Sequence, residues 1–230
     1  MTPGAIAQLR NDAGGLVCVA VSHAVAEAFG LPFLEDALDH PTAEDHDLSY
    51  DDRSSFSLSV NHRDTDTGIT DEDRSLTVRA LASAAATPER TKFAVEFRSP
   101  GHVTLLRAAP DLLADRRGHT ELGVALAEAS DVPPAVVVCE MLDDETGGAL
   151  SPSDAALYAE GHGIPYLEGT SVIERLGSLL VCCERRCRQH PQSVGTVRQF
   201  PESQQTCATR EEQSGSLGSC PTDISEQCRK

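Results

Sequence analysis

The chain has 230 residues, a net charge of −17 at pH 7 and a hydrophobic content of 40%. This length suits one globular domain with a sizeable core and is too short for two large ones. The strong negative charge argues against nucleic acid as a partner, because contacts to phosphates need clustered Lys and Arg. The longest apolar runs, residues 15–21 and 135–139, fall far short of the roughly 20 residues that span a bilayer. No signal-peptide pattern opens the sequence, so we expect a cytoplasmic protein without membrane association.

The acidic balance also restricts how this protein can recognise a ligand. Self-repulsion keeps such a chain soluble, as in the proteins of halophiles, which predicts a salt-loving source. A protein this acidic can bind a phosphorylated substrate only through local Arg residues, helix N-termini or a metal ion.

The composition changes near residue 177. Residues 178–230 are rich in Arg, Gln, Ser and Cys and show neither a strand nor a helix period. We therefore expect a folded domain over residues 1–177 and a disordered tail over 178–230, because the tail cannot bury enough apolar surface to offset the entropy of ordering. A zinc module is the alternative, although its four ligands would lack the usual C-x-x-C pair. Those ligands would be Cys182, Cys183, Cys187 and His190.

In chain order, the first half of the domain predicts two strands and two helices. Residues 15–21 form a short apolar run that is typical of a buried strand. Ser22 can cap a helix through residue 29, which Gly30 would end. Residues 56–60 alternate as a half-buried strand does. Thr70, followed by three acids, predicts a helix that runs to about residue 85.

The second half continues the mixture of strands and helices. Alternation predicts strands at residues 93–97 and 103–106, and a helix should run from residue 119 or 120 to about 130. A β-branched strand follows at 135–139. A helix that begins at Ser151 and Pro152 should stop at Gly161, before a short strand at 164–167. The fold class is therefore α/β or α+β with a mixed sheet.

The densest cluster of reactive side chains is RRGHTE, residues 116–121. His119 can ligate a divalent metal or move a proton, and the two Arg residues can hold a phosphate. Gly118 allows close approach of the backbone, and a helix that begins here would direct its N–H groups at an anion. A solvated turn with a capping His is the alternative.

Four other features could also carry chemistry, each with a simpler structural interpretation. His102 follows Ser-Pro-Gly in a tight turn, which is more often a surface loop than the position of a base. Residues 61–69 join a strand to a helix, where ligands often bind, although a polar loop with an N-cap suffices. Glu140 ends a strand and can act as an acid, base or ligand, or be an ordinary solvated Glu. Cys18 is more readily a small buried hydrophobe than a nucleophile.

Taken together and in this order, these motifs resemble the 3,4-dihydroxy-2-butanone 4-phosphate synthase family. The resemblance covers about residues 2–176. The matching segments are DAGGLVCVAV, SVNHRDTDTGITDEDRSLTV, FRSPGHVTLLRA, DRRGHTELGVALAEASDVPPAVVVCEML and the region through GIPYLE. The combination of RxGHTE with TGIxxxDR is specific to this family, and NHR before the TG resembles its archaeal members.

The resemblance implies a three-layer α/β (α+β) fold, with helices on both sides of a mixed, twisted sheet. It also implies a lyase of riboflavin biosynthesis that converts D-ribulose 5-phosphate to L-3,4-dihydroxy-2-butanone 4-phosphate and formate. The route is enolisation, loss of the C1 hydroxyl, a skeletal shift and expulsion of C4 as formate. Mg²⁺ or Mn²⁺ would be the cofactor, because a hard divalent ion can chelate vicinal substrate oxygens and stabilise an enediolate.

Roles for individual residues follow from the same resemblance. His119 should be the metal ligand, and the catalytic residues should be His119, Glu140 and His102. The substrate should be bound by Arg116, Gly118, Thr120, Thr67 and Glu140. His102 matches a His that approaches the active site of the partner subunit, which implies a homodimer with shared sites. Cys18 matches a Cys near the pocket.

The sequence departs from the family pattern at its start. Family members carry an acidic loop resembling DxxDREGExD, which supplies a metal-binding Glu, and no such segment precedes Thr2-Pro3. We therefore expect a member shortened at its N-terminus, without the first strand and the acidic loop. His119 alone is a poor Mg²⁺ site. A catalytically inactive remnant that at most binds sugar phosphate is the alternative.

Two further alternatives have weaker support. A bifunctional enzyme with a GTP cyclohydrolase half would need more than the roughly 50 residues of the tail. A related sheet fold that binds nucleotides and RNA ends conflicts with the negative charge and with the RxGHTE segment.

Overall fold

The computed structural model describes residues 1–43 and 53–176. The helices are α1 (Pro3–Gln8), α2 (His23–Phe29), α3 (Leu34–Ala37), α4 (Asp71–Ala86), α5 (Arg90–Glu96), α6 (His119–Ala129) and α7 (Pro152–His162). Three short turns of other helix types are η1 (Leu9–Ala13), η2 (Pro41–Ala43) and η3 (Leu112–Ala114). The strands are β1 (Cys18–Val21), β2 (Phe56–His62), β3 (Phe97–Arg107) and β4 (Ala135–Val138). The tail and zinc predictions for residues 178–230 lie outside the described residues.

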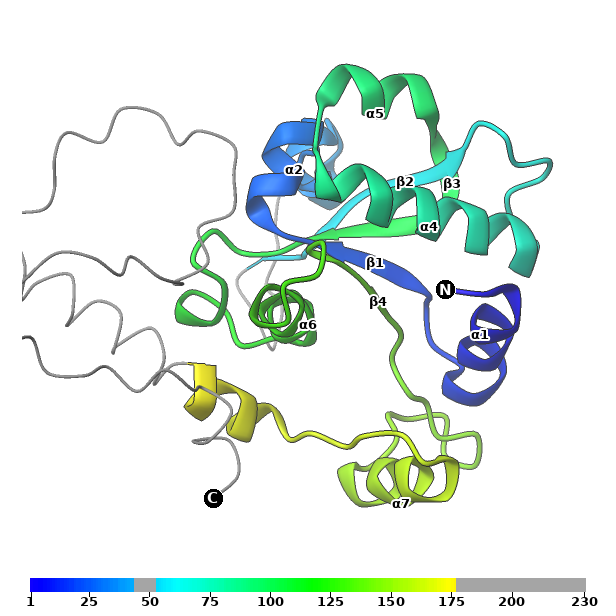
Figure 1. Ribbon diagram of the computed structural model, residues 1–230, viewed down its shortest axis with the longest axis vertical. Coiled ribbons are helices and arrows are strands. Elements are labelled where there is room, and N and C mark those ends of the chain that lie inside the picture. Colours follow the sequence, from blue (N-terminus) through cyan, green and yellow to red (C-terminus); the bar gives the residue numbers. More distant parts are fainter. Residues whose placement is uncertain (44–52, 177–230) are drawn as a thin grey trace, which may run out of the picture. The chain divides into compact units, whose positions relative to one another are not determined.

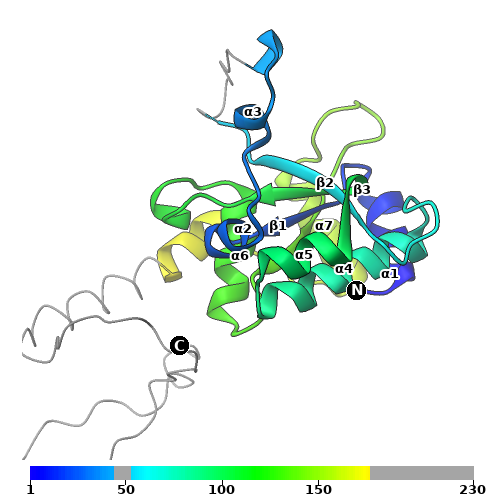
Figure 2. The same cartoon turned by 90° about the horizontal axis from the view of Figure 1, so that it is seen from above.

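The four strands form one mixed sheet in the order β2-β3-β1-β4 (Figure 1). β1 runs parallel to β3 and antiparallel to β4, while β2 and β3 are antiparallel and lie side by side (Figure 2). Val19 of β1 is paired with Leu105 on one side and with Val137 on the other. The start of β1 therefore lies beside the end of β4, which places Glu140 near residues 14–16.

Helices cover both faces of the sheet, because alternate side chains of a strand point to opposite faces. On one face, Val19 and Val21 pack with side chains from α2, α4 and α5, including Leu81 and Phe93. These three helices lie together on one side of the sheet, opposite α6 (Figure 1). On the other face, Cys18 and neighbouring residues pack against Val124 of α6. The expected α/β architecture of three layers with a mixed sheet is confirmed.

The predicted helix boundaries are largely confirmed by their caps. The hydroxyl oxygens of Ser22, Thr70 and Ser151 accept hydrogen bonds from backbone N–H groups in the first turns of α2, α4 and α7. Gly30 ends α2 with a φ of 69°, in the left-handed region that glycine occupies at low cost. α7 passes the predicted stop at Gly161, because Gly163, with a φ of 63°, adopts the left-handed C-cap conformation.

The predicted strand at residues 93–97 is wrong, since these residues end α5 and begin β3. Phe93 and Phe97 are four positions apart and stack with ring centroids 4.8 Å apart, and Phe93 also stacks on Phe29 at 4.4 Å. Val95, which a strand would place on the same face as these two rings, is 67% exposed. Phe93 in α5 and Phe97, directly after the helix, lie on the same side because they are one helical turn apart, and this explains the aromatic pattern.

The predicted strand at residues 164–167 is also absent from the described structure. Ile164, Tyr166 and Leu167 are each more than 40% exposed, and this segment has no strand assignment. Without a neighbouring strand, the backbone of this segment has no partner for a ladder of hydrogen bonds.

Among the described residues, no helix is both long enough and apolar enough to cross a membrane.

Candidate active site

Glu140 follows β4 and is anchored against the segment that leads into β1. Its Oε2 accepts a hydrogen bond from the N–H of Leu16 at 3.1 Å, and its carbonyl oxygen accepts one from the N–H of Gly15 at 3.1 Å. A Cβ at Gly15 would lie 2.4 Å from that carbonyl oxygen, so a larger residue would force the two segments apart. One carboxylate oxygen of Glu140 is thereby fixed to the backbone.

The other oxygen of Glu140 lies beside His119, the first residue of α6. His119 Nε2 and Glu140 Oε1 are 3.8 Å apart. The side chains are 61% and 47% exposed, so a ligand can reach both from solvent. An imidazole nitrogen and a carboxylate oxygen at this separation can share a divalent cation or exchange a proton through a substrate.

The start of α6 adds donors for an anion. The N-cap is Gly118, and no side chain caps the helix, so its first N–H groups have no acceptor from a capping side chain. Such N–H groups and the helix dipole favour negative charge. Thr120, the predicted substrate contact one position further on, is only 2% exposed. Its side chain therefore belongs to the interior of the domain.

The buried carboxylate of Glu121 lies next to the Arg116 guanidinium and fixes its position. The sequence motifs predicted no role for Glu121. Glu121 is fully buried, and its Oε1 accepts a hydrogen bond from the N–H of Ala109 at 3.1 Å. The same oxygen lies 3.9 Å from Nη1 of Arg116, which also contacts the hydroxyl of Ser55. The sequence feature that could have identified Glu121 is an acid on the inward face of a helix, which normally needs a buried cation.

Cys18 lies beneath this site and is only 1% exposed. Burial raises the pKa of its thiol to about 12, with the negative charge of Glu140 and the thiol of Cys139 adding to the effect. The thiol is therefore protonated at neutral pH and is not a nucleophile. This agrees with the interpretation of Cys18 as a small buried hydrophobe.

His102 and Thr67 lie in a second cluster, around the C-terminal end of β2 where this strand pairs with β3. His102, on β3, is exposed, and its neighbour across the strands is the buried Asn61. Thr67 lies in the loop between β2 and α4. Within the described residues, no hydrogen bond or ion pair links His102 or Thr67 to His119 or Glu140.

The loop that carries Thr67 is organised by Asp73 in the first turn of α4. The Asp73 carboxylate accepts hydrogen bonds from the N–H of Gly68 at 2.8 Å, the N–H of Asp66 at 3.3 Å and the hydroxyl of Thr67 at 3.3 Å. The bond from the Gly68 N–H is the main cause that lowers the pKa of Asp73. The carboxylate therefore occupies donors that an external anion could otherwise use.

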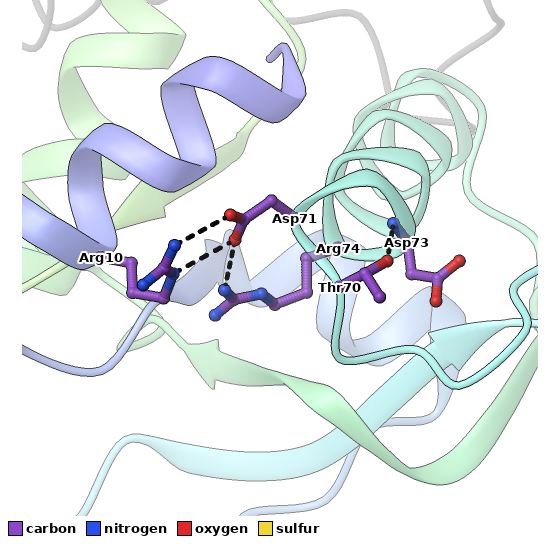
Figure 3. Close-up of polar contacts among 5 residues, drawn as sticks. All are labelled: Arg10, Thr70, Asp71, Asp73 and Arg74. Carbon is purple, nitrogen blue, oxygen red and sulfur yellow. Dashed lines mark hydrogen bonds and ion pairs between the residues drawn. The ribbon is translucent and has the colours of Figure 1, made fainter.

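A charged group next to Asp73 ties α4 to the segment before β1 (Figure 3). Arg10 Nη2 lies 3.1 Å from Asp71 Oδ2, and Arg74 Nη2 lies 2.6 Å from Asp71 Oδ1. The same view shows the N-cap bond from the N–H of Asp73 to the Thr70 hydroxyl. These contacts fix the position of the first turn of α4, and with it the Thr67 loop.

A separate cavity of about 470 Å³ lies between α2, α5 and the β2–β3 pair. Stacked aromatic rings and aliphatic side chains line it, and Arg63, Arg90 and Arg98 add positive charge. None of the predicted substrate or metal residues lines this cavity.

The His119–Glu140 pair by itself is an incomplete metal site. Across residues 1–43 and 53–176, no three His, Cys, Asp or Glu side chains lie together as the ligands of one ion would. Mg²⁺ and Mn²⁺ take about six ligands, mostly oxygen. The described residues therefore offer one imidazole and one carboxylate to such an ion, and the other ligands must come from elsewhere.

The fold and the site together define an α/β protein in which a helix N-terminus without a side-chain cap lies beside a His–Glu pair. The chain belongs to the 3,4-dihydroxy-2-butanone 4-phosphate synthase family, whose sequence model matches residues 1–175. This is a family of lyases in riboflavin biosynthesis.

Individual relatives show the same relationship. The 3,4-dihydroxy-2-butanone 4-phosphate synthase of Archaeoglobus fulgidus is 50% identical over 181 residues, which cover 74% of this chain and 76% of the relative. The Saccharomyces cerevisiae synthase is 36% identical over 178 residues, covering 76% and 78%. The Candida albicans synthase structure aligns with a TM-score of 0.63 at 30% identity, covering 76% of this chain and 79% of that one. A synthase structure in complex with two magnesium ions aligns with a TM-score of 0.65 at 26% identity, covering 77% and 80%.

Proposed function

We propose that this protein converts D-ribulose 5-phosphate to L-3,4-dihydroxy-2-butanone 4-phosphate and formate. The observation that carries this proposal is the placement of the RxGHTE segment. It begins α6 with His119 beside Glu140, in a chain that is 50% identical to a relative named for this activity. The acidic surface makes the local donors at the start of α6 more important for binding a phosphorylated sugar.

The substrate phosphate or sugar oxygens would bind at the start of α6. Arg116 offers a guanidinium that Glu121 and Ser55 hold in place, and Gly118 leaves the helix N-terminus open. Thr67 would act from the second cluster. Charge-assisted hydrogen bonds of this kind are the strong ones in phosphate recognition.

A divalent ion, Mg²⁺ or Mn²⁺, would be the cofactor. His119 would hold it from the protein side, and substrate oxygens, water or carboxylates outside the described residues would complete its coordination. When bound, the ion stabilises the negative charge that develops on substrate oxygens. A related synthase crystallised with two magnesium ions supports this assignment.

Glu140 would also move protons during enolisation. Its Oε2 is fixed by the N–H of Leu16, which leaves Oε1 to accept or return a proton at the substrate carbon. A carboxylate held in one orientation and half exposed to the ligand suits a general base.

His102 and Thr67 would complete the active site of a partner subunit in a homodimer. Both lie in the second cluster, and among the described residues no hydrogen bond or ion pair links them to His119. The resemblance assigns this shared arrangement to the family. We further propose that the protein is cytoplasmic and comes from an archaeal, halophilic source.

A second candidate function is sugar-phosphate binding without turnover. The observation that favours it is the lack of a third metal ligand among the described residues. In this case Arg116 and the start of α6 would still bind the phosphate, but the substrate would not be enolised.

The test is formate release from D-ribulose 5-phosphate by the full chain, with Mg²⁺ added and in high salt. His119→Ala should reduce the rate by at least a hundredfold. His40→Ala is the control: His40 is exposed and contacts Thr42 in its own turn, so this change should leave the rate of formate release unchanged. Folded protein that binds ribulose 5-phosphate but releases no formate would favour the second function.

A further inference from the structure

The side-chain amide of Asn61 makes two contacts with His102 across the β2–β3 pair. Its Oδ1 accepts a hydrogen bond from the backbone N–H of His102 at 2.8 Å. Its Nδ2 lies 3.2 Å from His102 Nδ1. Asn61 is 2% exposed, so water does not compete for these contacts. Both ends of one buried amide are thus engaged by a single residue.

The orientation of this amide is chemically determined. A rotation of the amide by 180° would place its NH₂ group against the backbone N–H of His102, donor against donor, at 2.8 Å. With the oxygen on the backbone N–H, the NH₂ group faces the ring. An amide NH₂ can only donate, so His102 Nδ1 must accept, and it can do so only when it carries no proton.

We infer that Asn61 is a positioning residue that holds the neutral His102 ring with its proton on Nε2. His102 Nε2 has no hydrogen-bond partner among the described residues, and the residue is exposed. The ring therefore presents an N–H donor to whatever binds beside it. A donor suits an oxygen of a sugar phosphate, and a neutral ring in this tautomer cannot accept a proton at Nε2.

The Thr67 loop keeps Asn61 in this position. A Cβ at Gly68 would lie 2.0 Å from Asn61 Nδ2, so the loop backbone packs directly on the amide. Gly68 has a φ of 86°, and its N–H is bound by Asp73. His102 and the Thr67 loop are therefore parts of one assembly with Asn61 between them.

The consequence for catalysis rests on the proposed function. In the proposed reaction, His102 binds the substrate by donating a hydrogen bond from Nε2 to a substrate oxygen, and Glu140 remains the group that removes protons. The tautomer itself does not depend on that function, so the two can be tested separately.

The direct test is ¹⁵N NMR of the imidazole nitrogens in the full-length protein, above the pH at which the ring is protonated. The His102 signal is identified by its loss in His102→Gln. In the parent protein, Nε2 should have the shift of a protonated nitrogen and Nδ1 that of an unprotonated one. A parent ring that is protonated on Nδ1 would overturn the inference.

Asn61→Asp replaces the NH₂ donor that faces His102 Nδ1 with an oxygen acceptor, with little change in side-chain shape. A carboxylate accepts at both oxygens, so Nδ1 should now carry a proton. Ser59→Ala is the matched control, because the Ser59 hydroxyl accepts from the N–H of Gly101 in the same turn without touching the imidazole. An Asn61→Asp protein that unfolds at the parent temperature but keeps the parent tautomer would also overturn the inference.

Kinetics of His102 variants then separate a donor from a base. Gln retains an N–H donor near the position of Nε2, so His102→Gln should keep KM for ribulose 5-phosphate within about threefold, whereas His102→Ala should raise KM about tenfold. A loss of a hundredfold or more in kcat for both variants would indicate a base and contradict the donor role. A parent protein without activity would count against the proposed function, and the NMR result would still decide the tautomer.

Discussion

At the scale of single residues, the site depends on close approaches that a sequence does not display. Glu140 is positioned because Gly15 has no side chain, and Arg116 is positioned because Glu121 is buried beneath it. The sequence motifs singled out His119 and Glu140, and the structure places these two side chains near each other. They could not show that Thr120 points inward or that Asn61 and Asp73 hold the second cluster, because these facts depend on long-range packing.

Gly15→Ala should lower the rate of formate release more than it lowers stability. The added Cβ would lie 2.4 Å from the carbonyl oxygen of Glu140, so the segment carrying the carboxylate must move. A misplacement of this kind can cost about a hundredfold in rate. Gly161→Ala on α7 is the matched control, because nothing lies within 4 Å of its added Cβ. It should be neutral or stabilise the protein by up to about 1 kcal/mol. Equal rates for the two variants would contradict the role given to Gly15.

Glu121→Ala should destabilise the protein and weaken substrate binding together. The variant lacks the carboxylate that accepts the hydrogen bond from the Ala109 N–H and that lies next to Arg116. Its free energy of unfolding should therefore fall by about 2 kcal/mol. Urea unfolding measures the first effect, and KM for ribulose 5-phosphate measures the second. Unchanged stability would show that Glu121 does not support this loop.

At the scale of elements, local sequence predicted the caps well and the short aromatic stretch poorly. Ser22, Thr70 and Ser151 each accept the expected N–H bond, because capping depends on residues only three positions apart. Phe93 and Phe97 fit both a strand and a helix, and only the stacking of Phe93 on Phe29 of α2 and on Phe97 decides between the two. Short alternating runs remain ambiguous until their packing partners are known.

The first turn of α4 should make stability depend on pH in the acid range. The pKa of Asp73 is lowered, mainly by the bond from the Gly68 N–H, and that of Asp71 is lowered, mainly by its bond from Arg10. A lowered folded-state pKa stabilises the fold above the unfolded pKa of about 4, and this stability is lost as pH falls below it. Asp73→Asn should flatten the dependence of the unfolding free energy on pH between about 5 and 3. An unchanged acid titration in the variant would contradict this assignment.

At the scale of the whole molecule, the net charge of −17 sets the conditions under which the fold is stable. Like charges repel across the surface of the compact state, and salt screens them over distances of about 3 Å at 1 M. The melting temperature should therefore rise between 0.1 M and 2 M KCl. A melting temperature that stays constant or falls over this range would contradict the halophilic interpretation.

The same scale explains why the fold class was predictable from the sequence and the site only in part. A mixed sheet that is apolar on both faces can be covered by helices in only a few arrangements. The observed structure has one of these, with a hydrophobic cluster on each face of the sheet. The relation between the His119 cluster and the His102 cluster is different, because no hydrogen bond or ion pair among the described residues links the two. Family motifs supplied the expectation of a shared site, and a homodimer remains a prediction.

The most direct measurement is turnover of D-ribulose 5-phosphate labelled with ¹³C at C4, by the full chain with Mg²⁺ in high salt. If the protein is the synthase that its site and its family indicate, formate is released and carries the label, because the skeletal shift expels C4. Folded protein that releases no formate, or formate without the label, would contradict the assignment.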